Sequence, residues 1–321
     1  MNTEHVTAHE ISIQEKQKPF ITPRLTFWQN MGVNLLLLLA TLIWGSTFLV
    51  VKDSIKVTGP FTFLALRFSI GAVVLALLFH RRLRRITGAE LRAGLIIGLF
   101  LFVAYALQTL GLQYTTTSMA AFITSLYVPF VPLFAILFLR QWPGNGVIPS
   151  ILLSSLGLVL ISFNNNFTFS FGLGELLTLG CAIAYALHII SISKFAPGAD
   201  AINLSIIQIA LTALLDWIAA PIAHEPLAMP PLSIWGSALF LGIFATAFCL
   251  VVMNRVQQFI SSVRATLGYA LEPVWTAAFG YLAGERLGPI AWAGCVCILL
   301  AMIVGNIRFR VPKGRGNLTE T

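Results

Sequence analysis

The sequence predicts an all-α membrane protein with ten transmembrane helices, arranged as two inverted five-helix repeats. Three observations support this prediction. Of the 321 residues, 57% are hydrophobic and 10% are charged, whereas about 25% of the residues in soluble globular domains are charged. The hydrophobic residues form ten separate runs, and the basic residues gather on alternate connections between them. A segment of the first half also resembles a segment of the second half.

The ten hydrophobic runs have the length of membrane spans. A bilayer core of ~30 Å requires about 20 mainly apolar residues in a helix. The predicted spans are 33–52, 60–79, 93–113, 117–139, 147–163, 172–191, 202–223, 234–253, 262–283 and 290–307. The fifth is the weakest, because it is short and begins near Pro149. No segment of soluble-domain size interrupts the series, so we expect the function to reside within the membrane bundle.

The Lys and Arg positions predict the orientation. With the N-terminus in the cytosol, 16 basic residues fall on the cytosolic side and three on the outer side (Lys52, Lys56 and Arg286), while Arg67 lies within a span. Basic residues concentrate on the cytosolic side of membrane proteins. We therefore predict a multi-pass protein of the plasma (inner) membrane with a cytosolic N-terminal tail, 1–32, and a basic cytosolic C-terminal tail, 308–321. The net charge of +8 is thus explained by topology and predicts no nucleic-acid partner.

An internal duplication relates the two halves. Residues 97–134 and 241–278 align without gaps at an offset of 144 residues. They share six identities: Gly98/Gly242, Phe100/Phe244, Gln113/Gln257, Ser118/Ser262, Ala121/Ala265 and Pro129/Pro273. The offset maps the third and fourth spans onto the eighth and ninth. Each repeat therefore holds five spans, 33–163 and 172–307, and an odd number inverts the second repeat, as in many secondary transporters.

The aligned prolines predict helix breaks or hinges at equivalent places. A proline inside a helix leaves the carbonyl four residues earlier without its backbone partner. Pro129 would free the carbonyl of Ser125, and Pro273 that of Tyr269. Either proline alone is explained by an ordinary packed kink. Paired interruptions in two halves favour a transport site near the middle of the membrane.

Charged residues at bilayer depth need a partner or a wet cavity, because their insertion costs ~3 kcal/mol or more. Arg67 and Glu272 lie near the middle of their spans, whereas Asp216 and Glu175 lie nearer the ends, where headgroups can solvate them. Arg67 could bind an anionic group, or pair with a carbonyl, a helix end or a carboxylate. Its approximate counterpart in the second repeat is Gln208. A role for this pair in holding helices together is at least as well supported as substrate binding.

Glu272 is the only acid that the sequence predicts at mid-span. Desolvation disfavours an isolated carboxylate there and makes its neutral form accessible. The group could carry a proton during a transport cycle or orient an amine-bearing substrate. Alternatively, it braces helices as a neutral group or as a partner of Arg67.

Aromatic and polar side chains at mid-span form the predicted substrate site. Several share a helix face at a spacing of three residues, and a face that mixes rings with hydrogen-bonding groups suits a cavity for small amphipathic molecules. The predicted substrate-binding residues are Trp44, Tyr105, Gln108, Tyr127, Tyr185, His188, Tyr269, Glu272 and Trp275. Any one ring alone is explained by ordinary packing. His188 has no second ligand at metal-binding spacing, so we expect a hydrogen-bonding role for it and no metal site.

Three segments carry a resemblance to a known family. They are Ile43-Trp44-Gly45-Ser46-Thr47-Phe48, the stretch Leu112 to Ile123, and Leu271-Glu272-Pro273-Val274 followed by Gly284-Glu285-Arg286-Leu287. Together they resemble the EamA-type members of the drug/metabolite transporter superfamily. The resemblance implies inverted five-span repeats, cytosolic termini, and export or exchange of small metabolites through a cavity between the halves. One departure is Gln141, where the first repeat of the family usually carries a glutamate.

The expected function is that of a secondary transporter, an exporter or exchanger of small amphipathic metabolites such as amino acids, working by alternating access. The expected partners are a small-molecule substrate and the lipid bilayer. A monomer is sufficient, although a homodimer remains open. No catalytic residue or cofactor is expected, because the sequence contains no nucleophile motif or phosphate-binding loop. The alternatives are a non-transporting membrane assembly or sensor protein and a membrane-embedded enzyme.

Overall fold

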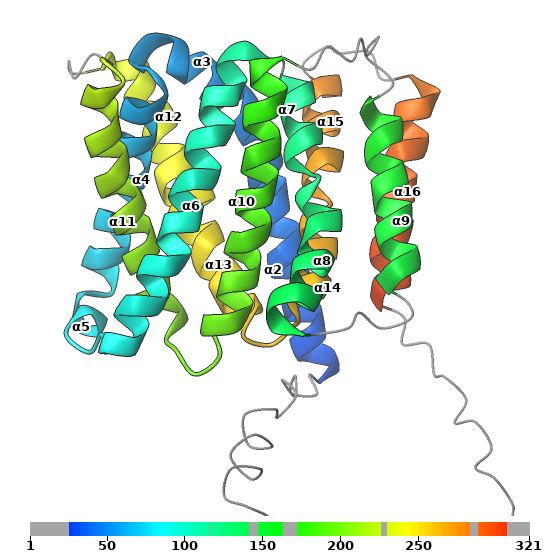
Figure 1. Ribbon diagram of the computed structural model, residues 1–321, viewed down its shortest axis with the longest axis horizontal. Helices are drawn as coiled ribbons and strands as arrows, with labels where there is room; N and C mark the ends of the chain where they lie inside the picture. The colour runs from blue at the N-terminus through cyan, green and yellow to red at the C-terminus, as the bar shows by residue number, and fades with distance from the viewer. Residues whose placement is uncertain are drawn as a thin grey trace, which may run out of the picture.

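The computed structural model describes residues 26–115, 117–140, 147–162, 172–225, 230–282 and 288–306. Within these ranges all regular secondary structure is helical, and the long helices run side by side as a bundle (Figure 1). The predicted all-α class is therefore confirmed. The predicted termini, the Gln141 position and the Gly284–Leu287 motif lie outside the described residues.

The helices follow the predicted spans closely. The first half contains α2 (Phe27–Gly45), α3 (Thr47–Thr58), α4 (Pro60–Leu78), α5 (His80–Leu83), α6 (Gly88–Tyr114), α7 (Thr117–Thr124), α8 (Tyr127–Leu139) and α9 (Val147–Ser162). The second contains α10 (Leu173–Phe195), α11 (Ala201–Ile222), α12 (Leu232–Phe240), the π-helix η2 (Leu241–Phe248), α13 (Cys249–Val256), α14 (Ser262–Tyr269), α15 (Glu272–Leu282) and α16 (Pro289–Asn306). Each predicted window thus coincides with helical residues.

Seven segments of the described chain are long and apolar enough to cross a membrane. They are Phe27–Thr58, Pro60–Leu78, Gly88–Tyr114, Met119–Leu139, Leu173–Phe195, Ala201–Ile222 and Leu232–Val256. Val147–Leu160 and Pro289–Ala301 are shorter apolar helices. The outward faces carry exposed apolar side chains such as Leu77, Leu137 and Ile222, as expected for contact with lipid. Ten crossings and the inversion of the second repeat remain predictions.

The first helix begins earlier than predicted. Thr26 and Gln29 form a capping box, in which each side chain accepts the backbone N–H of the other residue. This cap stabilises a helix start at Phe27, so residues 27–32 are helical and do not belong to the predicted tail. The same span is interrupted at Ser46, where α2 ends and α3 follows.

Helices α4 and α11 are tied to the other half of the chain at their N-termini. The Glu225 carboxylate, just after α11, accepts the backbone N–H groups of Phe61 at 3.0 Å and Thr62 at 2.7 Å in the first turn of α4. Glu90, in the first turn of α6, accepts the backbone N–H of Asp200, the N-cap of α11, at 2.8 Å. Helix α4 begins directly after α3, and α6 begins shortly after α5. Because α3 and α5 lie at opposite ends of the bundle (Figure 1), the two carboxylates connect the halves at opposite ends.

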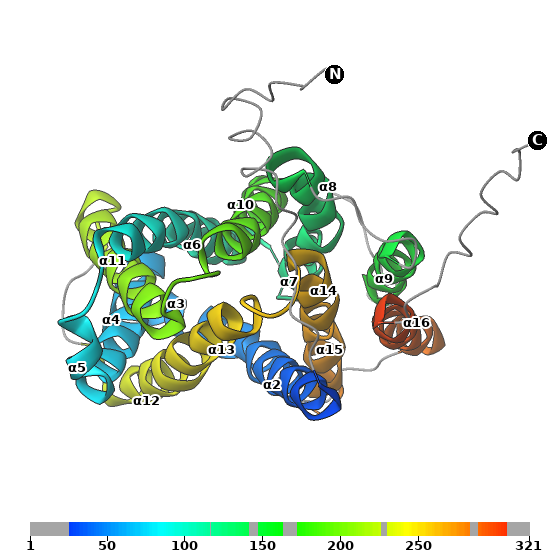
Figure 2. The same ribbon diagram turned by 90° about the horizontal axis from the view of Figure 1, so that it is seen from below.

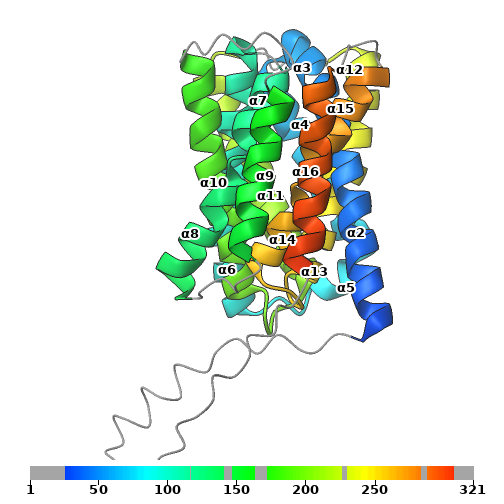
Figure 3. The same cartoon turned by 90° about the vertical axis from the view of Figure 1, so that its right-hand side faces the viewer.

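Helices α9 and α16 pack as a pair at one side of the bundle (Figures 2 and 3). Their backbones meet at Gly157, where a Cβ atom would lie 2.7 Å from the carbonyl oxygen of Gly294. Small residues allow such close packing in membranes, where it replaces the hydrophobic effect as a source of helix association. The other helices surround the centre of the molecule, where the candidate site lies.

Two helices are broken near the aligned prolines. The first break, at Ser125 and Leu126, separates α7 from α8, and the second, at Ala270 and Leu271, separates α14 from α15. Both breaks precede the prolines by a few residues. The prediction that Pro129 leaves the Ser125 carbonyl free is wrong, because the backbone N–H of Val128 donates to that oxygen at 3.0 Å. A tighter turn with an i to i+3 bond replaces the missing helical bond.

Candidate functional site: a central aromatic cavity

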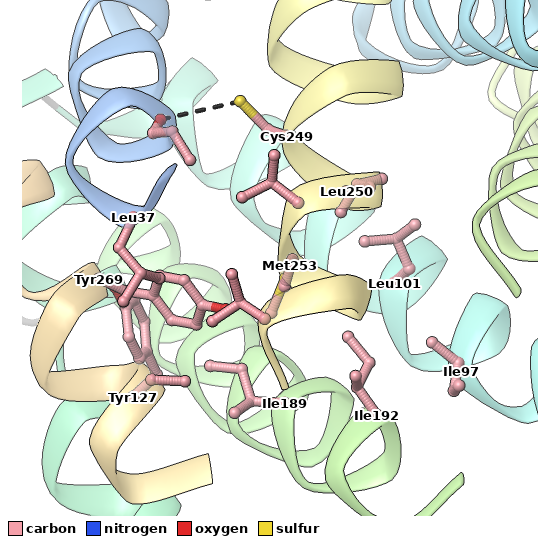
Figure 4. Packing of buried hydrophobic residues seen from close by; sticks show 14 of the residues in the cluster. Leu37, Ile97, Leu101, Tyr127, Ile189, Ile192, Cys249, Leu250, Met253 and Tyr269 are labelled. Atoms are coloured by element: carbon pink, nitrogen blue, oxygen red, sulfur yellow. Dashed lines mark hydrogen bonds between the residues drawn. The ribbon is translucent and has the colours of Figure 1, made fainter. Parts of the chain in front are cut away.

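A cavity lies between the two halves of the chain. The cavity is lined by Trp44, Thr47, Phe48, Leu101, Tyr105, Gln108, Thr124, Tyr127, Tyr185, His188, Ile189, Leu250, Met253, Tyr269 and Glu272. Figure 4 shows part of its surroundings, where Tyr127, Ile189 and Tyr269 from three different helices gather beside Leu250 and Met253 of α13.

Eight of the nine predicted substrate-binding residues line this cavity, and Trp275 does not. Trp275 follows Glu272 by three residues on α15, but its Cβ packs closely against Gly45 of α2. A Cβ added to Gly45 would lie 2.6 Å from that atom. Trp275 therefore helps to pack α15 on α2 and lies outside the cavity lining, while its role in substrate binding stays a prediction.

The rings of the wall contact one another edge to face. Tyr105 and Tyr185 have ring centroids 5.5 Å apart, Tyr127 and Tyr185 have centroids 6.4 Å apart, and Trp44 and Tyr269 have centroids 5.8 Å apart. Such pairs stabilise one another because the positive edge of one ring meets the negative face of the next. These rings come from five helices that are distant in the sequence, so the bundle itself assembles the wall.

Trp44 is held by an irregular helix. Its indole N–H donates to the carbonyl oxygen of Ala245 in η2 at 2.9 Å. A π-helix shifts the backbone bonding pattern, and such segments are frequent at functional sites. The Trp44 ring thus contributes a surface to the cavity, while its polar atom is used to join α2 to the second half. Nothing in the sequence predicted η2.

A chain of polar groups connects the wall to the first helix break. The Tyr185 hydroxyl donates to Gln108 Oε1 at 3.3 Å, and Gln108 Nε2 donates to Thr124 Oγ1 at 3.4 Å. Thr124 is the last residue of α7, immediately before the break. This cavity residue was not predicted, although its position five residues before Pro129 could have indicated it.

Glu272 is the one carboxylate among the described residues of the cavity wall. It opens α15 directly after the second break, where the N-terminal end of a helix favours negative charge. Its carboxylate forms no hydrogen bond or ion pair with any residue that the structure describes. The alternative of an ion pair with Arg67 is not formed, since the ion pairs within the described ranges are Lys56–Asp53 and Arg82–Asp200. The Glu272 carboxylate is therefore available to a bound molecule.

Arg67 lies behind the wall. Its side chain is buried, its Nε donates to Thr246 Oγ1 at 2.7 Å, and its guanidinium carbon lies 4.9 Å from the centre of the Tyr105 ring. Arg67 does not line the cavity. These contacts join α4 to η2 and α6, in agreement with the predicted role in holding helices together.

His188 and Gln208 form a second buried contact between helices. His188 Nε2 and Gln208 Oε1 are 2.9 Å apart, which links α10 to α11. His188 Nδ1 has no hydrogen-bond partner among the described residues, and the imidazole lines the cavity. The contact with Gln208 holds the ring in place, and Nδ1 is left without a partner among the described residues.

Asp216 contradicts the sequence prediction. We expected it near a helix end, in reach of headgroups, but its side chain is fully buried, and neither carboxylate oxygen has a hydrogen-bond partner in the described parts of the chain. Asp216 belongs to α11, which packs against α4 and α6. Glu272 is thus not the only acid in the interior. The prediction for Glu175 agrees better, because this residue caps the start of α10 by accepting the backbone N–H of Gly172.

The family model and the related sequences that match this chain all belong to transporters. The model of the EamA-like transporter family matches residues 31–163 and again residues 172–307. An uncharacterized transporter of Archaeoglobus fulgidus is 31% identical over 281 residues, which cover 87% of each chain. The uncharacterized transporter YyaM of Bacillus subtilis is 21% identical and aligns over 89% of this chain and 97% of its own. A crystal structure shares the fold, with a TM-score of 0.69 at 20% identity, over 86% of this chain and 96% of that one.

Proposed function

This chain belongs to the EamA-like transporter family, and on that premise we propose that it carries small amine-bearing amphipathic molecules across the membrane through the central cavity. The observation that carries the proposal is the Glu272 carboxylate, which lines the cavity without a partner among the described residues. A cationic or hydrogen-donating head group would complete its contacts. The aromatic rings around it would cover the apolar body of the same molecule.

The charges of the wall support this substrate class. The described lining residues include one acid, Glu272, and one imidazole, His188, but no Lys or Arg. Arg67 lies behind the wall, where its guanidinium group contacts Thr246 and the hydroxyl group of Tyr105. A cation above aromatic faces gains ~0.5–2 kcal/mol from the rings. Amines, including amino acids whose carboxyl group is modified, suit this lining better than anions do.

The mechanism that we propose is alternating access. Two interrupted helices, α7–α8 and α14–α15, come from the two segments that match the family model, and both breaks adjoin the cavity. Broken helices at the interface of two repeats are a common arrangement for a central site. We further propose that the protein resides in the plasma (inner) membrane with both termini in the cytosol and works as an exporter or exchanger.

Transport by purified protein in liposomes tests this proposal. The panel consists of radiolabelled amino acids, amino acid amides, nucleobases and cationic drugs. We expect uptake of at least one amine, and a roughly 10- to 100-fold loss of apparent affinity in Glu272→Gln, since a hydrogen bond to a charged group contributes ~1.5–3 kcal/mol. Glu175→Gln is the matched control, because that carboxylate lies at a helix end.

Two outcomes would contradict the proposal. If folded protein moves no compound of the panel, a non-transporting assembly or sensor protein becomes the better description. If an amine is transported equally well by the wild type and Glu272→Gln, the carboxylate does not bind it. In that case Glu272 would be reassigned to helix packing.

A further inference from the structure

We propose that Asp216 is a proton-binding site separate from the central cavity, and that Arg67 couples it to the cavity wall. The coupling rests on the proposed transport function, whereas proton binding by Asp216 does not. Asp216 lies on α11 and does not line the cavity. A larger ligand would need a cavity at Asp216, whereas a proton needs none. The ligand that we propose for this site is therefore a proton.

The burial of Asp216 is the first step of the argument. The side chain is fully buried, and both oxygens lack a hydrogen-bond partner among the described residues. An ionised carboxylate without a partner is strongly disfavoured in the interior of a membrane bundle. A bound proton at Asp216 would remove this cost.

The second step is the position of Asp216 relative to Arg67. Helices α11 and α4 pack with opposite chain directions, since Trp217 Nε1 donates to Ser69 Oγ at 3.0 Å and Glu225 accepts the backbone N–H of Thr62. This register puts Asp216 about one helical turn from the level of Arg67. Their separation exceeds that of an ion pair, because Arg82–Asp200 and Lys56–Asp53 are the ion pairs of the described chain.

Of the other helices that pack against α11, α13 carries Cys249 and Arg255, and α5 carries His80, Arg81 and Arg82. On α6 the titratable residue beside Arg67 is Tyr105, and η2 contains no titratable residue. Beyond the end of α11, the carboxylate of Glu225 is held by the N-terminus of α4. Arg67 is thus the group that would respond when Asp216 loses its proton.

The third step connects Arg67 to the cavity. Arg67 now contacts neutral partners, Thr246 and Tyr105, and the Tyr105 hydroxyl lies 3.4 Å from Arg67 Nη2. When Asp216 releases its proton to water, the new carboxylate attracts the guanidinium. A shift of Arg67 would withdraw its support from Tyr105, whose ring lines the cavity and contacts Tyr185. Proton occupancy at Asp216 and the shape of the wall would then change together.

Infrared spectroscopy of the purified protein tests proton binding without any substrate. At pH 7 we expect a carbonyl stretching band of a protonated carboxyl group that Asp216→Asn lacks and that Glu225→Gln and Glu272→Gln retain. Asp216→Glu should shift the frequency of this band. If Asp216→Asn does not fold, this shift is the test of whether the band belongs to Asp216. Identical bands in the wild type and a folded Asp216 variant would overturn the proposal.

Transport in liposomes tests the coupling once an amine substrate is found. Asp216→Asn mimics the protonated acid, so this variant should keep downhill exchange of the substrate. An imposed pH gradient should no longer raise its transport rate, so the ratio of the rates with and without the gradient should be about 1. Undiminished stimulation in this variant would refute the coupling. If the wild type transports nothing but the infrared band behaves as expected, the proposed function fails and the proton site stands.

Discussion

The Glu225 carboxylate accepts the backbone N–H of Thr62 at 2.7 Å and so ties the connection after α11 to the start of α4. Glu90 forms the equivalent contact with Asp200 at the other end of the bundle. In an alternating-access cycle, each end has to open in turn. The two carboxylates are therefore candidates for the contacts that close the two ends.

Replacing either carboxylate should destabilise the protein. Glu225→Gln and Glu90→Gln each keep one acceptor oxygen but lose the charge that favours a helix N-terminus. We expect a loss of ~1–2 kcal/mol, because hydrogen bonds to charged groups and N-caps contribute energies of this order. The measurement is thermal unfolding in detergent. Asp53→Asn is the control, since its ion pair with Lys56 is exposed, and an equal loss in this variant would argue against a specific role.

Reporter fusions test the predicted topology. The basic residues predict cytosolic ends, with Pro197 on the same side as the C-terminus. Fusions of a cytosol-active reporter after Pro197 and after Thr321 should both be active, and a periplasm-active reporter at these sites should be silent. An outer location of either site would contradict the inverted repeat.

Removing a proline should affect transport more than folding. Pro273 follows the break between α14 and α15, and Pro273→Ala restores a backbone donor that allows the two helices to join. We expect transport to fall at least about tenfold, which corresponds to ~1.4 kcal/mol, while the folded yield stays near that of the wild type. Pro289→Ala, at the first position of α16, is the control because a proline there replaces no helical bond. A parallel fall of yield and transport would indicate a structural role alone.

The pair formed by α9 and α16 should depend on Gly157. A Cβ at this position would lie 2.7 Å from the Gly294 carbonyl oxygen, so Gly157→Ala should cost ~1–3 kcal/mol through overpacking. Gly236→Ala on α12 is the matched control, since nothing lies within 4 Å of its Cβ. The control should be neutral or stabilising by up to about 1 kcal/mol. Unfolding in detergent measures both, and equal stability of the two variants would show that the helix pair adapts.

Much of the fold followed from the sequence because the bilayer simplifies the problem. An apolar run of about 20 residues has to satisfy its backbone internally, and a helix does so within one segment. Within the described residues, the ten predicted windows therefore coincide with helices, and the helix breaks lie close to Pro129 and Pro273. Mid-span polarity also identified most of the cavity wall, because a polar group at that depth needs a protein partner or a cavity.

Tertiary packing decided the partners and the burial of individual side chains, which the local sequence pattern does not determine. The orientation of Trp275 toward Gly45, the π-helix that receives the Trp44 indole, and the burial of Asp216 all depend on which helices meet and at which height. The same holds for Arg67, whose partner is Thr246 and not Glu272. Apolar residues are distributed nearly uniformly around a membrane helix. The sequence therefore predicts how deep in the bilayer a residue lies, but not which face of the helix points into the bundle. Only contact between helices settles which polar groups meet.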